Sequence, residues 1–97
     1  SSSDMSGVLS DSQIQEKLAS LPGWGREGKE IVRTYEFPTF PEAIAFVDRV
    51  AQAAEEANHH PDIDIRYTRV TLRLTSHDSG GLTERDFSLA ARADALV

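Results

Sequence analysis

Cysteine and long apolar runs are missing from this 97-residue sequence. Without cysteine, the chain can form neither disulfide bonds nor thiolate metal sites. No segment approaches the roughly 18 apolar residues of a membrane span, and the first seven residues lack the basic and apolar parts of a signal peptide. We therefore expect a cytoplasmic protein with no membrane partner.

Positive charge is scarce as well. Ten Lys and Arg residues stand against 16 Asp and Glu residues, which gives a net charge of −6, and the basic residues form no cluster. Binding to the phosphate backbone of a nucleic acid depends on concentrated positive charge. We therefore expect no direct binding to nucleic acid.

The short chain limits the number of domains and the size of the core. We expect residues 8–97 to form one domain, and residues 1–7 to be a disordered N-terminus or a cloning remnant. A domain of this size buries only about 60–65% of the surface of its unfolded chain. Because no disulfide can add stability, self-association is the expected source of further burial, and we predict a homo-oligomer.

The first part of the sequence predicts a helix followed by a hairpin. Ser10 and Gln13 have the spacing of a capping box and begin a helix over residues 11–21. Residues 24–37 predict two extended segments joined by a turn at residues 27–29, because the second segment is rich in β-branched and aromatic side chains.

A second capping-box pair, Thr39 and Glu42, begins the longest predicted helix. Pro61 disfavours the helical conformation for the residue before it, so this helix is expected to end near Asn58 or His59. Its expected apolar stripe consists of Ile44, Val47, Val50, Ala51 and Ala54.

The last part predicts two more strands and a final helix. Apolar residues alternate in two phases over residues 63–74, and the break between the phases predicts a tight turn at residues 68–69. His77 is expected to end the last strand. Thr83 and Asp86 form a third cap-like pair, and they begin a helix whose apolar residues are Phe87, Ala90, Ala91 and Leu96.

The predicted elements follow the order helix, two strands, helix, two strands, helix. Hairpin-linked strands with helices between them indicate an α+β domain, in which helices cover one face of a four-stranded antiparallel sheet. The other face is left open. We expect the interface of the homo-oligomer to include this open face or an exposed sheet edge along residues 70–75.

All three histidines lie in two places, His59 and His60 at the end of the second helix and His77 seventeen positions later. Histidine exchanges protons near neutral pH, since its unperturbed pKa is about 6.5. Glu55 precedes His59 by four positions, which makes the two residues neighbours on a helix. Because the ends of an antiparallel hairpin return close together, His77 is expected near the other two, in a cluster that suits proton transfer.

Simpler interpretations of the same residues remain open. Adjacent histidines before Pro61 could only cap the helix, where a protonated imidazole interacts with the helix dipole. Three histidines with Glu55 could also bind zinc, although no compact helical spacing such as His-Glu-x-x-His is present. Trp24 follows a Pro-Gly turn, and a lone tryptophan there is more often a core or interface anchor than part of a ligand site.

A resemblance to a known family adds to this reading of the residues. The chain closely resembles the pterin-4a-carbinolamine dehydratases in Ala54-Glu55-Glu56-Ala57-Asn58-His59-His60-Pro61, in Leu74-Thr75-Ser76-His77-Asp78 and in Gly81-Leu82-Thr83-Glu84-Arg85-Asp86. The similarity also takes in Gly23-Trp24, Phe37 and residues 42–46, so it covers nearly all of the chain from the first helix onward. One departure is Ile63, where some members carry a tryptophan.

The resemblance implies a dehydratase that removes water from 4a-hydroxytetrahydropterin in tetrahydrobiopterin recycling and forms the quinonoid dihydropterin. No metal or organic cofactor is implied. The implied catalytic residues are His59, His60 and His77, and the implied supporting or substrate-binding residues are Glu55, Asp86, Trp24 and Pro61. The resemblance also implies a homodimer or homotetramer.

Two other functions stay open. Members of this family are also known as dimerisation partners or coactivators of transcription factors, and a related pterin, such as one of molybdenum-cofactor metabolism, could be processed at the same site. A pure binding module would not need three histidines together with Glu55. The histidines therefore favour the dehydratase, in which one imidazole delivers a proton and another takes one.

Overall fold

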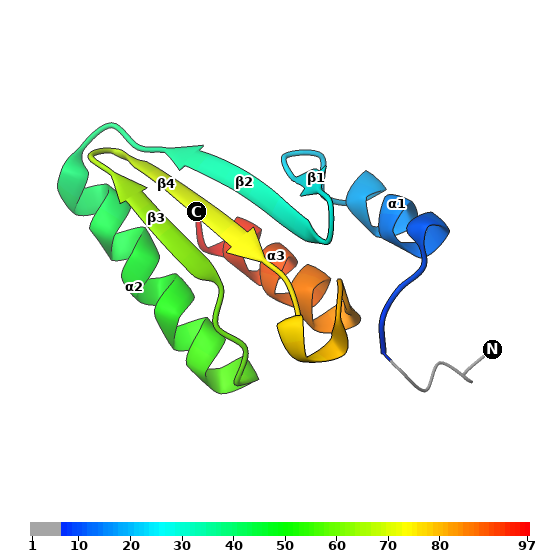
Figure 1. Ribbon diagram of the computed structural model, residues 1–97. Helices are drawn as coiled ribbons and strands as arrows, with labels where there is room; N and C mark the ends of the chain where they lie inside the picture. Colours follow the sequence, from blue (N-terminus) through cyan, green and yellow to red (C-terminus); the bar gives the residue numbers. More distant parts are fainter. Residues whose placement is uncertain (1–6) are drawn as a thin grey trace.

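The computed structural model describes residues 7–97, and its elements follow the predicted order (Figure 1). The expectation for residues 1–7 falls almost wholly on residues 1–6, which lie outside the described part of the chain. A short 3₁₀ turn before the last helix was not expected from the sequence. The elements are α1 (Asp11–Ala19), β1 (Gly25–Glu27), β2 (Glu30–Glu36), α2 (Phe40–Ala57), β3 (Asp62–Arg66), β4 (Arg69–Leu74), the turn η1 (His77–Ser79) and α3 (Glu84–Leu96).

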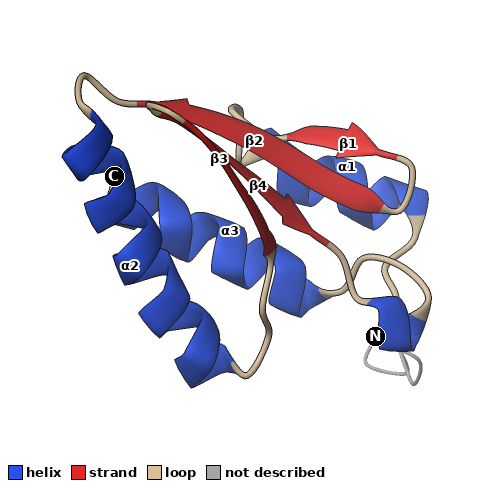
Figure 2. Cartoon of the chain, turned by 60° about the vertical axis from the view of Figure 1, so that its left-hand side comes forward, coloured by secondary structure: helices blue, strands red, loops and turns tan. Residues whose placement is uncertain are grey.

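The four strands form one antiparallel sheet in the order β1-β2-β4-β3, which confirms the predicted α+β class. Helices α2 and α3 lie on one face of the sheet, and α1 lies beside β1 at one end (Figures 1 and 2). The opposite face is polar in its centre, where the hydroxyl groups of Thr34 and Thr71 are 3.1 Å apart. The largest fully buried apolar side chains, between the sheet and the helices, are Ile31, Val50, Val70, Leu72, Leu74 and Leu82.

The hairpin of β3 and β4 turns at Tyr67 and Thr68, one position earlier than predicted. Tyr67 has the left-handed backbone conformation, with φ of 60°, and Arg66 and Arg69 close the hairpin as a cross-strand pair. A large side chain rarely adopts a positive φ. The alternation of apolar residues therefore predicts where the strand pattern is interrupted, but it does not identify the two residues that form the turn.

The exposed sheet edge is not where the sequence predicted it. Strand β4 pairs with β2 on one side and with β3 on the other, so residues 70–75 do not form an edge. Leu72, in the middle of β4, is only 1% exposed. The outer strands of the sheet are β3 and β1, and β1 covers only residues 30–32 of β2. Edge-to-edge pairing could use these outer strands or residues 33–36 of β2, which β1 leaves uncovered.

The ends of two helices differ from the predictions. Helix α1 ends at Ala19 and not at Leu21, because the chain turns at Ser20, whose N–H donates to the carbonyl of Lys17 over 3.0 Å. Thr39 is the N-cap residue of α2, but its side chain makes no capping hydrogen bond, so the predicted capping box is absent there. None of the helices within residues 7–97 has the length and apolar content to cross a membrane.

The buried faces of α2 and α3 are rotated from the predicted stripes. Ile44 and Ala51 of α2 are exposed, whereas Phe46, which the predicted stripe omitted, is buried against the ring of Tyr35 at 4.7 Å between centroids. Ala91 of α3 is exposed as well. The ring of Tyr35 in β2 packs on the buried face of α2. The buried residues are Ala43, Phe46, Val50, Ala53 and Ala54 in α2 and Asp86, Phe87, Leu89, Ala90 and Ala93 in α3.

Candidate active site

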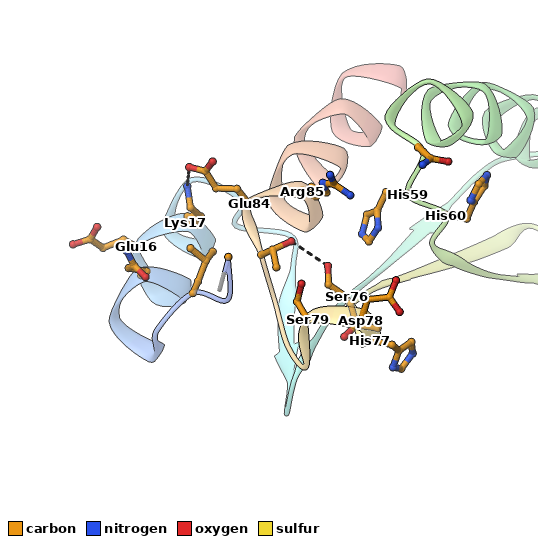
Figure 3. Close-up of a pocket in the computed structure, with 16 residues that line it drawn as sticks. Glu16, Lys17, His59, His60, Ser76, His77, Asp78, Ser79, Glu84 and Arg85 are labelled. Atoms are coloured by element: carbon orange, nitrogen blue, oxygen red, sulfur yellow. Dashed lines mark hydrogen bonds and ion pairs between the residues drawn. The ribbon is translucent and has the colours of Figure 1, made fainter. Parts of the chain in front are cut away.

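One open cleft, with a volume of about 1160 Å³, is lined by all three histidines (Figure 3). Its walls come from the start of the described chain, from α1, from the junction of α2 with β3, and from the segments around η1 and the start of α3. The β3–β4 hairpin returns His77 to the cleft that His59 and His60 also line, as expected from the spacing.

The backbone at the C-terminal end of α2 turns His59 and His60 toward different partners. Asn58 has the left-handed conformation, with φ of 54° and ψ of 40°, and its N–H donates to the last carbonyls of the helix. The N–H of His59 donates to the carbonyl of Ala54 over 3.0 Å. Asparagine is one of the few residues that adopt this conformation readily. The backbone of Asn58 and His59 thus caps the helix, and both imidazoles are left for other contacts.

His59 faces a buried carboxylate. Its Nε2 lies 2.5 Å from Oδ1 of Asp86, within hydrogen-bonding distance, and the two side chains are 13% and 0% exposed. Oδ2 of Asp86 accepts hydrogen bonds from the N–H of Thr83 and from the hydroxyl of Ser76, each over 3.0 Å. A buried charge is tolerated when its oxygens are hydrogen-bonded in this way. The arrangement holds the imidazole of His59 in one orientation.

His60 faces solvent and a different carboxylate. Its Nε2 donates to Oε2 of Glu55 over 2.9 Å, and the two side chains are 59% and 76% exposed. The expected contact of Glu55 with His59 is not formed, because the left-handed Asn58 interrupts the helical geometry between them. An exposed pair of this kind contributes roughly 0–1 kcal/mol to stability. The two adjacent histidines therefore have unequal surroundings.

His77 begins the turn η1 and does not end a strand, since β4 stops at Leu74. The backbone of Ser76 holds this turn: its carbonyl accepts hydrogen bonds from the N–H groups of residues 79–81 over 2.9–3.2 Å. The side chain of His77 is exposed, and within residues 7–97 its imidazole has no hydrogen-bond partner. It extends from the η1 side of the cleft (Figure 3).

Trp24 and Pro61 do not line this cleft, although both were expected at the substrate site. Trp24 is 5% exposed, and its Nε1 donates to Oδ1 of Asp94 over 3.4 Å. The same oxygen accepts from Nη1 of Arg33 over 3.0 Å and from the hydroxyl of Tyr35. Burial, together with the hydrogen bond to Asp94, raises the pKa of Tyr35 well above its ordinary value. Trp24 thus matches the alternative interpretation, a core anchor.

Several polar residues of the cleft were not expected from the sequence. The hydroxyl groups of Ser76 and Thr83 are 3.0 Å apart beside Asp86. Lys17 lines the cleft and forms an ion pair of 3.5 Å with a glutamate of α3, whereas Arg85 lines it without an ion-pair partner among the described residues. The cap-like spacing of Thr83 and Asp86 was the one available signal. Ser76 and Arg85 lie in the segments that resemble the dehydratase family, but no spacing in the sequence indicated a role for either of them.

The zinc alternative has no ligand set in the described part of the chain. Among residues 7–97, no three His, Asp or Glu side chains are placed to hold one metal ion. Two of the imidazoles each face a carboxylate, and the third is free. Three proton-exchanging groups in one cleft, with different partners, suit general acid–base catalysis.

Comparisons with known proteins place this chain among proteins named as pterin dehydratases. The sequence model of the family described as pterin 4 alpha carbinolamine dehydratase matches residues 7–96. A protein of Roseiflexus castenholzii, provisionally named pterin-4-alpha-carbinolamine dehydratase, is 55% identical over 93 residues, which are 96% of this chain and 100% of that protein. A protein of Chloroflexus aurantiacus with the same provisional name is 60% identical over 89 residues, which are 92% of this chain and 96% of that protein.

Two solved structures are similar to the fold. The crystal structure of a transcriptional coactivator/pterin dehydratase from Brucella melitensis has a TM-score of 0.89 at 33% identity, and the match covers 92% of this chain and 97% of that one. A pterin dehydratase-like protein, identified as a RuBisCO assembly factor in the alpha-carboxysome, has a TM-score of 0.66 at 31% identity, over 76% of this chain and 88% of that one. The first similarity includes nearly the whole chain.

Proposed function

The chain belongs to the pterin 4 alpha carbinolamine dehydratase family, and we propose that it removes water from 4a-hydroxytetrahydropterin to give the quinonoid dihydropterin. The observation that carries this proposal is the meeting of His59, His60 and His77 in one cleft, where His59 and His60 are held by carboxylates of very different burial. We place the reaction in tetrahydrobiopterin recycling in the cytoplasm, without a metal or organic cofactor.

The elimination is a balanced exchange of protons. The bond between C4a and its hydroxyl oxygen breaks, and the oxygen takes a proton and leaves as water. N5 gives its own proton to a base, and the electron pair of that bond forms the double bond between N5 and C4a. No electrons are gained or lost overall. The protein therefore has to supply one acid and one base, each of which typically contributes about 10²–10⁴-fold in rate.

The three imidazoles differ in the way this reaction requires. His59 is fixed by Asp86, whereas the exposed His60 and the unpartnered His77 can turn toward a bound ring. Two imidazoles in opposite protonation states near pH 7 serve as acid and base for one substrate. A fixed imidazole on one wall and a more mobile one on another thus supply both proton transfers to a pterin bound between them.

A direct assay tests this function. Purified protein is mixed with synthetic 4a-hydroxytetrahydropterin, and the rate of formation of the quinonoid product is compared with the spontaneous rate. We expect an acceleration that is lost in the double variant His59→Ala, His60→Ala and kept in Asp48→Asn, an exposed position on α2 away from the cleft. A rate equal to the spontaneous rate would overturn the proposal. A faster rate with a related pterin, such as one of molybdenum-cofactor metabolism, would change the substrate but not the reaction.

A binding role is a second candidate, favoured by aromatic side chains exposed where the tip of the β3–β4 hairpin meets the start of α2. Phe40 and Tyr67 stack with their ring centroids 6.4 Å apart, and they are 46% and 80% exposed. The Brucella melitensis relative is described as a transcriptional coactivator as well as a pterin dehydratase, and another relative as a RuBisCO assembly factor. By analogy, this chain would act as a dimerisation partner or coactivator of a transcription factor.

The two roles can be separated by variants on opposite sides of the domain. Phe40→Ser combined with Tyr67→Ser should abolish copurification with candidate transcription factors and keep the rate of dehydration, because neither residue lines the cleft. If the transcription factors still copurify with this double variant, Phe40 and Tyr67 do not form the binding surface. The structural support for the second role is then lost.

A further inference from the structure

The neighbours of Asp86 fix the direction of every proton around it. Oδ2 accepts from the N–H of Thr83 and from the hydroxyl of Ser76, and Oδ1 lies 2.5 Å from Nε2 of His59. Ser76 Oγ also lies 3.0 Å from Thr83 Oγ1. A serine hydroxyl has a single proton, and an ionised carboxylate can only accept. With Asp86 ionised, Ser76 and Nε2 of His59 therefore both donate to it. The hydroxyl of Thr83 then donates to Ser76.

This order of donors determines which nitrogen of His59 carries a proton. Nε2 must be protonated to donate to Oδ1 of Asp86, so the neutral imidazole has a bare Nδ1. Nδ1 has no hydrogen-bond partner within residues 7–97, and His59 lines the cleft. The nitrogen that is left for a ligand is thus a proton acceptor when the ring is neutral.

We propose that Ser76 is a positioning residue for His59. Its hydroxyl occupies Oδ2 of Asp86 together with the N–H of Thr83, and this double contact prevents the carboxylate from rotating. Oδ1 then stays directed at Nε2 of His59, which holds the tautomer that presents a bare Nδ1 to the cleft. The inference rests on the proposed function only where it predicts activity, because the tautomer can be measured without substrate.

A merely structural role of Ser76 can be distinguished from this one. The first turn of α3 is capped by the contact of the Thr83 N–H with Asp86, and η1 is held by the backbone carbonyl of Ser76. Neither contact uses the Ser76 hydroxyl. Ser76→Ala should therefore preserve the cap and the turn, and remove only the hydroxyl contacts with Asp86 and Thr83.

Long-range ¹H–¹⁵N spectra of uniformly ¹⁵N-labelled protein test the proposal, because they report which nitrogen of each histidine is protonated. In the wild-type protein, we expect His59 to be the Nε2–H tautomer. In Ser76→Ala, we expect a mixture of tautomers and a fall in kcat of about tenfold, equivalent to about 1.4 kcal/mol, with KM unchanged, since positioning acts in the transition state. Ser76→Thr keeps the hydroxyl and should keep both the tautomer and kcat. Ser88→Ala, at an exposed serine of α3, is the matched control and should change neither.

Each result supports or overturns the proposal. An Nδ1–H tautomer of His59 in the wild-type protein would overturn it without any activity measurement, and so would Ser76→Ala with wild-type tautomer and kcat. If no form of the protein dehydrates 4a-hydroxytetrahydropterin, the proposed function fails, while the spectra still decide whether Ser76 orients His59. If circular dichroism shows that Ser76→Ala is unfolded, the spectrum of Ser76→Thr tests the proposal instead. The wild-type tautomer of His59 in Ser76→Thr supports the role of the hydroxyl. A changed tautomer contradicts it.

Discussion

Glu55 accepts a hydrogen bond from His60, five positions further along the chain, and not from His59, which is four positions away and faces Asp86. The left-handed conformation of Asn58 causes this exchange of partners. As a result, two adjacent histidines differ in burial, in the carboxylate that each one faces and in their freedom to move. The next two predictions depend on that difference.

The exposed histidines should be needed for catalysis but not for folding. His60→Ala or His77→Ala is expected to lower kcat by about 10²–10⁴-fold, the usual contribution of one acid or base. Both side chains are exposed, so circular dichroism and urea unfolding should remain close to those of the wild type. If either variant keeps near-full kcat with a native spectrum, its assignment to proton transfer is wrong.

The two carboxylates should differ in their effect on stability. Asp86→Asn leaves a buried donor facing other donors, and we expect it to lower the free energy of unfolding by about 1–3 kcal/mol. Glu55→Gln, at a position that is 76% exposed, should cost less than about 1 kcal/mol. Urea denaturation of both variants measures the difference. If the two variants lower the free energy of unfolding equally, the hydrogen bonds of Asp86 stabilise the fold no more than the exposed pair of Glu55 and His60 does.

Alkaline pH should destabilise the protein through Tyr35. Its pKa is raised by burial and by Asp94, against the smaller opposing effect of Arg33, so the folded state keeps a proton that an unfolded tyrosine loses near its usual pKa of about 10. The contribution is complete below about pH 10 and is lost as the pH rises toward the folded-state pKa. Urea unfolding at increasing alkaline pH should show a falling free energy, with a shallower fall for Tyr35→Phe. Parallel curves for the two proteins would contradict this prediction.

Dehydration should not require a metal ion. The elimination needs only proton transfer, and the described imidazoles face carboxylates or solvent. Exhaustive dialysis against a strong chelator is therefore expected to leave kcat unchanged. Loss of activity on dialysis, restored by adding zinc, would replace the acid–base proposal with a metal-dependent one.

We expect a homodimer or homotetramer in which β3 pairs edge to edge with β3 of a second copy. Within the described residues, the outer side of β3 has no strand partner, and Ile65 is 39% exposed beside it. Pairing across a two-fold axis would satisfy the backbone groups and bury this side chain. Ile65→Lys should shift sedimentation toward the monomer. The buried Leu72 is not a suitable probe, because Leu72→Lys would disturb the core.

Two outcomes would contradict this interface. A single wild-type species near 10.7 kDa at micromolar concentration would exclude the homo-oligomer. Ile44 on α2 is about as exposed as Ile65, at 37%, and provides the comparison. If Ile44→Lys dissociates the assembly and Ile65→Lys does not, the helix face and not the β3 edge is the interface.

Local sequence signals predicted the order of elements and the meeting of the histidines. The capping box of Ser10 and Gln13 is formed as predicted, and the Pro61 rule placed the end of α2 within two residues. The hairpin brings His77 to the cleft because strand pairing follows directly from alternation and chain length. These features depend on residues that are close to one another in the chain, so they can be predicted from the sequence.

Features that depend on tertiary contacts were missed. The Thr39 side chain has the right spacing for a capping box but does not form the bond, and the buried face of α2 is chosen by the aromatic ring of Tyr35. The resemblance implies a position near the substrate for Trp24, and it gave no sign that the indole donates to Asp94, 70 positions away. The proposed role of Ser76 depends on the contact of its hydroxyl with Asp86, ten positions further along the chain. No local pattern encodes such distant partners.

The hairpin of β3 and β4 accounts for most of the chain between His60 and His77, and its open end pairs Asp62 with Arg73. Residues added at its tip, one to each strand, would leave the open end in place, whereas a single insertion or deletion in one strand would turn every side chain beyond it to the opposite face of the sheet. Paired additions therefore preserve the register of the open end, whereas a single added residue preserves it only if a β-bulge absorbs it. Changes confined to the tip at Tyr67 and Thr68 leave the pairing of Asp62 with Arg73 in place, and with it the approach of His77 to the cleft.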